Sequence, residues 1–294
     1  MFINGSIRLY RTLGILVGLL TLGGAMPAWA QLGLGLVPMR VELRMGPGQQ
    51  HTGSLKLSSE SGERTRVRAE VLDFHIDDTA TPQFEHDLPQ EAANSCKNWL
   101  SLNPMEIELE KGGFLMARYT LRLPADVPEG SYNCAAGFTT LPPAEQGIGI
   151  GMRMAVRVVA AFYVQVGDPP VRGVLKEMKL EALPPALGAQ PEGWQAVVVL
   201  QNEGRMYFRP TGKIEVLDGE GKALETLDFP SLPVLRQRDQ RFLFPLKTRL
   251  EPGHYTLRAN VDLGTGEIQV GSAEVAVHPA QPAPVDVAHK VAER

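Results

Sequence analysis

The chain has 294 residues, of which 44% are hydrophobic and only 6% aromatic, and its 29 basic and 33 acidic residues give a formal net charge of −4. A chain of this length has room for two domains. The acidic balance argues against nucleic acid as a partner, because phosphate backbones are bound by an excess of Lys and Arg.

Residues 1–30 predict a secretory signal peptide. Arg8 and Arg11 precede an apolar run over residues 13–24, and a small-x-small cleavage site ends at Ala30. The apolar run is about twelve residues long, well short of the roughly twenty that a membrane span needs. We therefore expect cleavage after Ala30, a periplasmic location and no membrane span in the mature chain.

A first domain is expected over residues 31–166. Its apolar and polar residues alternate in short runs separated by turn residues, which is the pattern of β-strands. Seven such runs in this length predict an immunoglobulin-like β-sandwich. The predicted strands are 37–44, 52–58, 64–76, 105–109, 114–123, 131–140 and 147–166.

The last of these predicted strands is unusually long. Every even position from 148 to 166 is apolar, whereas Arg153, Arg157, Tyr163 and Gln165 lie on the opposite face of the strand. Most strands have about five or six residues, so this one extends beyond what the core of one domain needs. In isolation, the same pattern also fits a central sandwich strand with one buried face.

A second all-β domain is expected over residues 171–278, after a short stiff linker at 167–170 with the sequence GDPP. The tail at 279–294 is rich in Pro and Ala and is expected to be disordered. The sequence thus predicts an all-β protein with two immunoglobulin-like β-sandwich domains in tandem. The strands predicted in the second domain are 176–181, 195–201, 212–217, 223–229, 241–246, 254–262 and 271–277.

Both halves contain a tight turn that leads into a strand with an early tyrosine. The sequence PEGSY ends at Tyr132, and the sequence EPGHY ends at Tyr255. This arrangement is typical of the tyrosine corner of immunoglobulin-like sandwiches, in which the phenol bonds back to the preceding corner.

Cys96 and Cys134 are the only cysteines of the chain. An even pair in an exported protein favours a disulfide over a metal or redox site. Cys96 lies beside Trp99 in a loop, which differs from the bridge position of antibody domains. We expect the disulfide to pin residues 94–102 against the predicted strand 131–140.

Other chemistry finds little support in the sequence. Acidic and histidine residues cluster between 73 and 87, but they match no known metal-binding spacing, and a solvated acidic loop explains them better. The glycines at 147–151 lie within a strand pattern and precede no helix, unlike a phosphate-binding loop. No nucleophile elbow or catalytic triad is evident. We expect no enzymatic activity, no metal and no cofactor. The cluster consists of Asp73, His75, Asp77, Asp78, Glu85, His86 and Asp87.

Residues 36–166 resemble the PapD-like periplasmic pilus chaperones. The resemblance lies in the order and pattern of short motifs more than in identity. In chain order these are Met39-Arg40-Val41-Glu42-Leu43, Gly53-Ser54-Leu55-Lys56-Leu57, the SCKNWLSLNP stretch at 95–104, Leu121-Arg122-Leu123-Pro124, PEGSY at 128–132 and the long strand at 147–166.

The resemblance implies a function for the long strand. In that family, the last strand of the first domain is donated to a subunit that lacks its own closing strand, which is a form of β-strand addition. The implied partners are exported pilin-like subunits and an outer-membrane usher. The side chains that would enter the subunit are Ile148, Ile150, Met152, Met154 and Val156.

The resemblance also implies a carboxylate anchor. Two basic residues of the family hold the terminal carboxylate of the subunit in the cleft between the domains. By position, Arg40 corresponds to the first and Arg157 to the second, with Arg153 as the alternative. A guanidinium suits this role because it binds a carboxylate through two parallel hydrogen bonds.

A scaffold function is the main alternative. Two immunoglobulin-like modules on a cell surface or cell wall would share the same composition without chaperone activity, and Arg40 and Arg157 would then be ordinary solvated residues. A carbohydrate-binding module is less favoured, because only 6% of the residues are aromatic.

Overall fold

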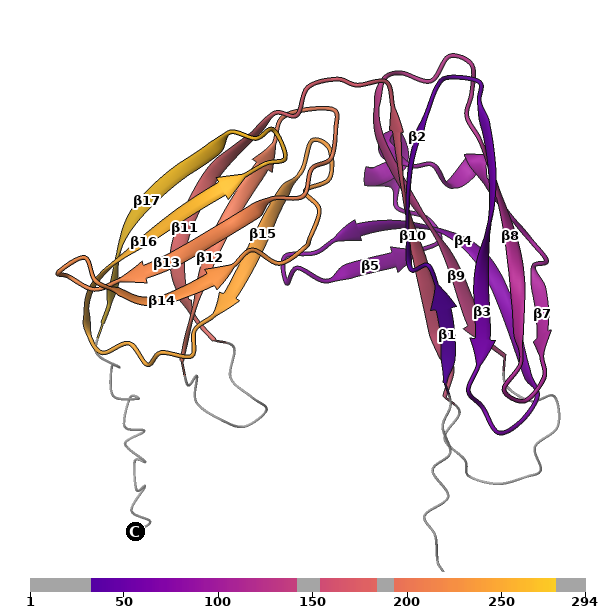
Figure 1. Ribbon diagram of the computed structural model, residues 1–294, viewed down its shortest axis with the longest axis horizontal. Helices are drawn as coiled ribbons and strands as arrows, with labels where there is room; N and C mark the ends of the chain where they lie inside the picture. Colours follow the sequence, from indigo (N-terminus) through magenta and orange to yellow (C-terminus); the bar gives the residue numbers. More distant parts are fainter. Residues whose placement is uncertain (1–32, 142–153, 184–192, 279–294) are drawn as a thin grey trace, which may run out of the picture.

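The computed structural model describes residues 33–141, 154–183 and 193–278 and consists of two β-sandwiches. Figure 1 shows them standing side by side as an arch, joined at the top. The predicted all-β, tandem immunoglobulin-like fold is confirmed. The predicted signal peptide, the C-terminal tail and the candidate residues Ile148, Ile150 and Met152 lie outside the described residues.

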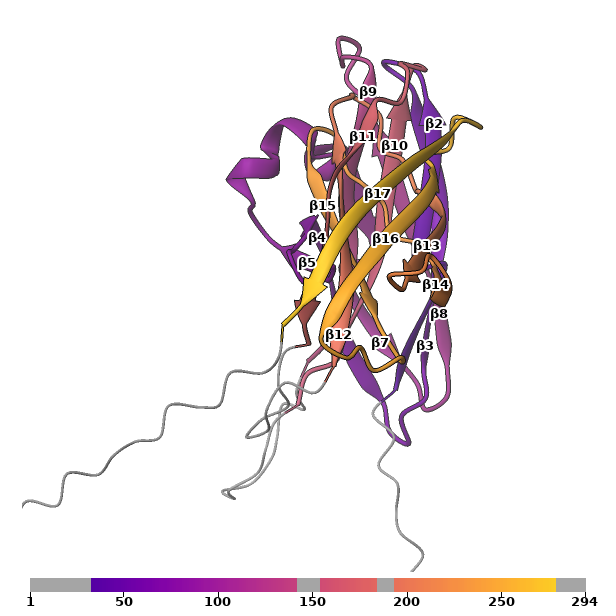
Figure 2. The same cartoon turned by 90° about the vertical axis from the view of Figure 1, so that its left-hand side faces the viewer.

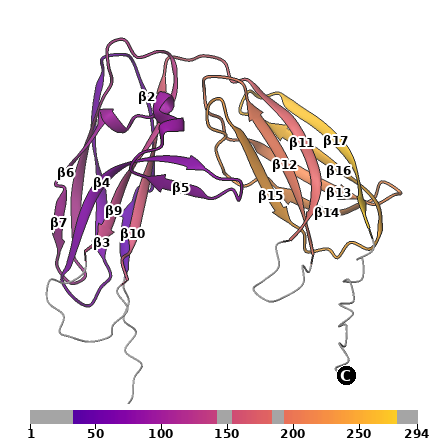
Figure 3. The same ribbon diagram turned by 180° about the vertical axis from the view of Figure 1, so that it is seen from behind.

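The first sandwich has two sheets, which we call outer and inner. The outer sheet has the strand order β1-β3-β8-β6, and the inner sheet has the order β2-β10-β9-β4-β5, with β7 also paired to β4. The inner sheet faces the second sandwich, and the outer sheet lies on the far side of the domain (Figure 3). The elements are β1 (Leu34–Val37), β2 (Arg40–Met45), β3 (Gln50–Ser59), β4 (Thr65–Ile76), β5 (Pro82–Glu85), the 3-10 turns η1 (Pro89–Asn94) and η2 (Lys97–Trp99), β6 (Leu100–Asn103), β7 (Glu106–Leu109), β8 (Phe114–Arg122), β9 (Gly130–Thr140) and β10 (Arg157–Val166).

The core of the first sandwich comes from the alternating pattern of its strands. In β8, Ala117, Tyr119 and Leu121 point inward, and Phe162 of β10 meets the edge of the Tyr119 ring at a centroid distance of 4.9 Å. Phe138 and Phe162 have no exposed surface. Burial of each such side chain contributes about 2 to 3 kcal/mol to folding before conformational entropy is counted.

The second sandwich pairs a three-stranded sheet, β11-β12-β15, with a four-stranded sheet, β14-β13-β16-β17. Its core contains Leu200, Ile214, Phe242 and Leu257, none of which is exposed. All seven strands predicted here are present (Figure 2). They are β11 (Gly173–Ala182), β12 (Trp194–Asn202), β13 (Thr211–Leu217), β14 (Ala223–Asp228), β15 (Asp239–Pro245), β16 (Gly253–Asp262) and β17 (Ile268–Val277).

The predicted strand 37–44 contains most of β2 but only the last residue of β1, and these two strands belong to different sheets. Residues 34–36 of β1 were not predicted to be a strand. β1 pairs with β3 in the outer sheet, and β2 pairs in parallel with β10 in the inner sheet. The change of sheet occurs at Pro38, which has no N–H to donate to a ladder and fixes its own φ. The short strands β5 and β6 were not predicted.

The described part of the long predicted strand is shorter than expected. β10 begins at Arg157, and the prediction that residues 154–156 are strand is wrong. The reason is that β9 ends at Thr140, opposite Val156. There the Val156 N–H donates to the Thr140 hydroxyl at 2.9 Å, and within the described residues no strand pairs with 154–156.

The Cys96–Cys134 disulfide is present, and both residues are fully buried. It joins η2 to β9, and Ser95 forms an isolated bridge with Asn133 beside it. The segment that precedes β6 is thus held against β9, as the sequence predicted.

Both tyrosine corners are confirmed. The Tyr132 hydroxyl donates to the Pro128 carbonyl at 2.8 Å, and the Tyr255 hydroxyl donates to the Glu251 carbonyl at 2.7 Å. Each bond reaches back four residues and fixes the turn that feeds a central strand, β9 or β16.

Removal of each phenol tests how much these corners contribute. We expect Tyr132→Phe to lower the free energy of unfolding by about 1 to 2 kcal/mol, because a buried hydrogen bond is lost. Tyr255→Phe is the matched control in a more exposed corner, and its expected cost is roughly 0.5 to 1 kcal/mol. Urea denaturation of both variants measures the difference. A larger cost for Tyr255→Phe would contradict this reasoning.

Candidate functional site

The first half of β10 has an unpaired backbone edge. β2 begins at Arg40, opposite Ala161, and the Ala161 N–H donates to the Met39 carbonyl at 3.0 Å. Because backbone groups alternate sides along an antiparallel strand, the N–H and C=O groups of Arg157 and Val159 point to the same side as those of Ala161. Within the described residues, no hydrogen bond reaches them on that side. β1 runs alongside but bonds to β3. We call this segment the open edge.

Exposed apolar side chains surround the open edge. Val37 and Met39 flank Pro38 with 65% and 62% of their surfaces exposed, and Met154 is 66% exposed. Val156 is half-buried. Met154 and Val156 are the two side chains predicted to enter a partner that the structure describes. Of these, Met154 is accessible to solvent.

A second cluster lies where the inner sheet meets the second domain. Glu42 of β2 binds two guanidinium groups with one carboxylate oxygen: its Oε1 is 3.5 Å from Arg40 Nε and 3.3 Å from Arg209 Nε. Arg209 follows β12 and belongs to the second sandwich. One carboxylate thus joins an arginine from each domain.

Two tyrosines form the walls beside this cluster. The Arg209 guanidinium carbon is 4.8 Å from the centre of the Tyr163 ring and 5.9 Å from that of Tyr207. Burial, together with the nearby Glu42 carboxylate, raises the pKa of Tyr207 to about 12. Burial also raises the pKa of Tyr163, although the Arg209 guanidinium acts in the opposite direction. Both phenols therefore stay protonated at neutral pH and can donate hydrogen bonds.

Tyr163 lies on the face of β10 that the sequence predicted, but it makes contacts there that the sequence did not predict. The alternation correctly excluded it from the core of the first sandwich, but Tyr163 is only 6% exposed. It packs with Phe74 of β4 and with Tyr207 and Leu235 of the second domain in a small apolar cluster. The outer face of β10 is therefore partly an interdomain contact.

Backbone contacts also join the two domains. The Ser131 N–H donates to the Arg205 carbonyl at 2.7 Å, and the Ser131 hydroxyl accepts the Tyr207 N–H at 2.8 Å. The Arg236 guanidinium lies 5.2 Å from the centre of the Tyr132 ring. Ser131 is buried at the start of β9, so these contacts anchor the second domain beside the first tyrosine corner.

The two predicted anchors occupy different environments. Arg157 is bound by Glu70 at 3.2 Å and by the Thr139 hydroxyl at 3.2 Å. It lies on the same sheet face as Arg40 but is four residues from Ala161, about 13 Å along the strand. No contact between Arg40 and Arg157 is found in the described part of the chain. Arg153 lies outside it.

The sequence interpretation missed Arg209. Nothing in the local sequence marks it, because its role depends on the docking of the second domain against β2. Its Nη1 donates to the Ser231 carbonyl at 3.3 Å, while its Nη2 is buried and has no hydrogen-bond partner among the described residues. Within the part of the chain that the structure describes, this buried Nη2 is an unsatisfied donor between the two domains.

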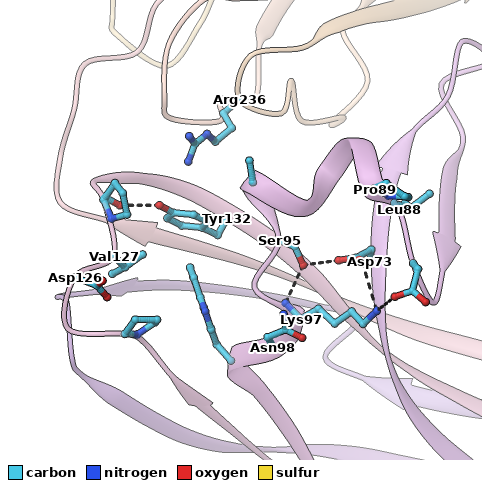
Figure 4. Close-up of a pocket in the computed structure, with 15 residues that line it drawn as sticks. Asp73, Leu88, Pro89, Ser95, Lys97, Asn98, Asp126, Val127, Tyr132 and Arg236 are labelled. Carbon is cyan, nitrogen blue, oxygen red and sulfur yellow. Dashed lines mark hydrogen bonds and ion pairs between the residues drawn. The ribbon is translucent and has the colours of Figure 1, made fainter.

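A cleft of about 730 Å³ opens beside the disulfide (Figure 4). Trp99 and Tyr132 form part of its wall, with ring centroids 4.7 Å apart, and Arg236 reaches over it from the second domain. Lys97 extends across its floor toward Asp73 and Asp87, at 3.8 Å and 2.5 Å.

The acidic cluster is less solvated than the sequence suggested. Asp73 is only 6% exposed and accepts a hydrogen bond from Ser95. Asp77 binds Thr79 and Thr81 within its turn, and these bonds lower its pKa to about 2. Within the described ranges, no group of three or more His, Cys, Asp or Glu side chains is placed to hold a metal ion. Likewise, no helix in those ranges has the length and apolar character of a membrane span.

No protein-family model and no curated protein matches the chain. Solved structures of similar fold include the class 5 fimbriae chaperone CfaA, with 10% identity, a TM-score of 0.42, and coverage of 83% of this chain and 100% of that chain. The YadV chaperone has 10% identity, a TM-score of 0.42 and coverage of 82% and 98%. The E. coli chaperone DraB has 14% identity, a TM-score of 0.38 and coverage of 84% and 99%. The chain is similar to these three chaperones in fold, over most of its length and at low identity.

Proposed function

We propose that the protein is a periplasmic chaperone that binds and caps pilus- or fimbria-type subunits by adding a β-strand to them. The observation that carries this proposal is the open edge of β10. An edge with free N–H and C=O groups pairs readily with another chain, so a protein that keeps one exposed needs a partner for it. Pairing there would extend the inner sheet beyond β10.

The side chains near the open edge suit this mode of binding. In strand addition, main-chain hydrogen bonds supply affinity and alternate side chains enter pockets of the partner. Met154 and Val156 would be two such side chains. Ile148, Ile150 and Met152 continue the same alternation in sequence and would extend the contact. The mechanism is non-catalytic and needs no cofactor, and an outer-membrane usher would receive the bound subunit.

The terminal carboxylate of the subunit would bind between the two domains beside β2, with Arg40 as its anchor. Arg209 is a better candidate than Arg157 for the second anchor, because Arg40 and Arg209 already bind the same carboxylate oxygen of Glu42. A subunit carboxylate would take the place of Glu42 between these two guanidinium groups. Arg157, about 13 Å along the strand, is bound by Glu70 and is the competing second anchor.

Single substitutions at these three arginines test the proposal. Tagged protein is recovered from periplasmic extract, and the captured small exported polypeptides are identified and quantified by mass spectrometry. We expect Arg40→Ala and Arg209→Ala each to lower capture roughly ten- to a hundredfold, because a charge-assisted hydrogen bond is worth about 1.5 to 3 kcal/mol. We expect Arg157→Ala to retain most of the capture.

Arg258→Ala is the matched control. Arg258 pairs with Glu215 at 2.7 Å on the second sandwich, away from the cleft, and its loss should leave capture unchanged. If Arg157→Ala lost capture while Arg209→Ala did not, the anchor would be Arg40 with Arg157. If no small exported polypeptide were captured, or if all variants captured it equally, the chaperone proposal would fail and the scaffold interpretation would take its place.

A further inference from the structure

The exposed face of the outer sheet combines basic and apolar side chains and contains no acidic residue. Strand alternation places one set of side chains from β1, β3, β8 and β6 on this face. The chain as a whole has more acidic than basic residues, so the positive charge of this face is opposite in sign to the net charge of the chain. The outward residues are Gly35, Val37, Gln50, Thr52, Ser54, Lys56, Ser58, Ser101, Asn103, Phe114, Met116, Arg118, Thr120 and Arg122.

The apolar and basic side chains of this face lie next to one another. Strand register puts Val37, Lys56 and Met116 in one row across three strands. Phe114 is in the next row, and the Lys56 ammonium lies 4.7 Å above the centre of its ring. Val37, Phe114 and Met116 are 65%, 65% and 51% exposed, which is unusual for large apolar side chains. Arg118 continues the patch beyond Met116. We call these five residues the basic-apolar face.

The positive charges of this region are not neutralised within the molecule. Among the described residues, no carboxylate lies within ion-pair distance of Lys56, Arg118 or Arg122. Arg122 donates to the Gln50 side chain at 2.8 Å, which leaves its charge unchanged. The region therefore attracts anions, and its apolar side chains add a driving force that a simple counter-ion would not use.

We propose that the basic-apolar face binds an anionic phospholipid surface. Lys and Arg beside Phe and other apolar side chains are the combination that peripheral proteins present to anionic lipids. Three apolar side chains standing out from a flat sheet can enter the headgroup boundary without a shaped partner pocket. Lys56 can cover the Phe114 ring with its aliphatic stem and still reach a phosphate.

This orientation is compatible with the rest of the fold. The second sandwich docks against the inner sheet, and in the described part of the chain no element covers the exposed face of the outer sheet (Figure 1). A bilayer at the outer sheet would leave Arg40 and Arg209, which lie between the two domains, free. The proposal concerns the outer sheet, whereas the proposed function uses the edge of β10 in the inner sheet, so it does not depend on that function. Val37, at the end of β1, lies where the two surfaces meet.

Vesicle co-sedimentation tests this proposal with the chain from residue 31 onward, because the apolar run at 13–24 would bind lipid by itself. The vesicles contain either phosphatidylcholine alone or phosphatidylcholine with about one third phosphatidylglycerol. We expect binding to the anionic vesicles only, weakening as salt rises from roughly 0.05 to 0.5 M. Lys56→Gln with Arg118→Gln should lower the partition coefficient about 25-fold, or roughly fivefold per cation.

Two further variants separate the contributions. Phe114→Ser should weaken binding even at low salt, because it removes the largest exposed apolar side chain. Lys213→Gln with Arg249→Gln removes the same charge from exposed positions of the second sandwich and should leave binding unchanged. Equal effects of the two double variants, equal binding to both vesicle types, or no binding would each overturn the proposal. An acidic protein would then be the better candidate for this face.

Discussion

Loss of the Cys96–Cys134 disulfide, by reduction or by alanine substitution of both residues, is expected to lower the free energy of unfolding of the first domain by about 4 kcal/mol. The bond closes a loop with a sequence separation of 38 residues, and in the chain-entropy model this restricts the unfolded state strongly. Such a loss is a large part of the stability of a typical domain.

The structure also predicts which segment responds first. η2 contains no buried residue, and the Cys96 N–H donates to the Asn133 carbonyl at 3.2 Å. Without the disulfide, the Ser95 bridge, which includes this hydrogen bond, and the contact of Trp99 with the Tyr132 ring remain to hold the segment on β9. The cleft beside Trp99 and Lys97 should therefore lose its shape before the sandwich unfolds.

Tryptophan fluorescence during urea denaturation measures the effect in each domain. From residue 31 onward, each sandwich has one tryptophan, Trp99 in the first and Trp194 in the second. In the Trp194→Phe variant the fluorescence signal comes from the first domain alone. In the Trp99→Phe variant it comes from the second domain alone. We expect reduction to shift the Trp99 transition and to leave the Trp194 transition in place. A shift of less than about 1 kcal/mol at Trp99 would contradict the chain-entropy argument.

Local patterns predicted most of the fold. Strand alternation found the seven strands of the second sandwich, and the PEGSY and EPGHY motifs predicted hydrogen bonds that Tyr132 and Tyr255 make. The disulfide followed from there being two cysteines in a chain expected to be exported. The strands and the tyrosine corners depend on residues that are close in sequence. The disulfide could be predicted because two cysteines allow only one pairing.

The candidate site was harder to predict because it depends on contacts between distant segments. The alternation of β10 predicted that Tyr163 points away from the core of the first sandwich. It could not predict that Tyr163 is buried, because Tyr207, which packs against its ring, belongs to the other domain. Arg40 was singled out, yet its shared carboxylate with Arg209 depends on how the two sandwiches dock. The change of sheet at Pro38, which leaves the edge of β10 open, likewise follows from pairing with β3 and not from the residues of β1 alone.

A proline at position 159 should abolish strand addition while leaving the fold intact. The Val159 N–H points to the open edge and has no partner in the described part of the chain, so the fold loses no ladder bond when it is removed. An incoming strand would lose that donor and meet the pyrrolidine ring. We expect subunit capture to fall at least about a hundredfold, which corresponds to roughly 3 kcal/mol.

Two substitutions at neighbouring positions separate an edge effect from a loss of folding. Val159→Ala keeps the N–H and should capture nearly as well as the wild type. Ala160→Pro removes an N–H on the side of β9, where Ala160 pairs with Ala136 in a fully buried position, and should destabilise the first domain severely. Thermal denaturation and subunit capture are measured for all three variants, so that a loss of capture can be compared with any loss of stability. If Val159→Pro were folded and still captured the subunit normally, the open edge would not be where the partner strand pairs, because a strand paired there would lose the Val159 donor and meet the pyrrolidine ring.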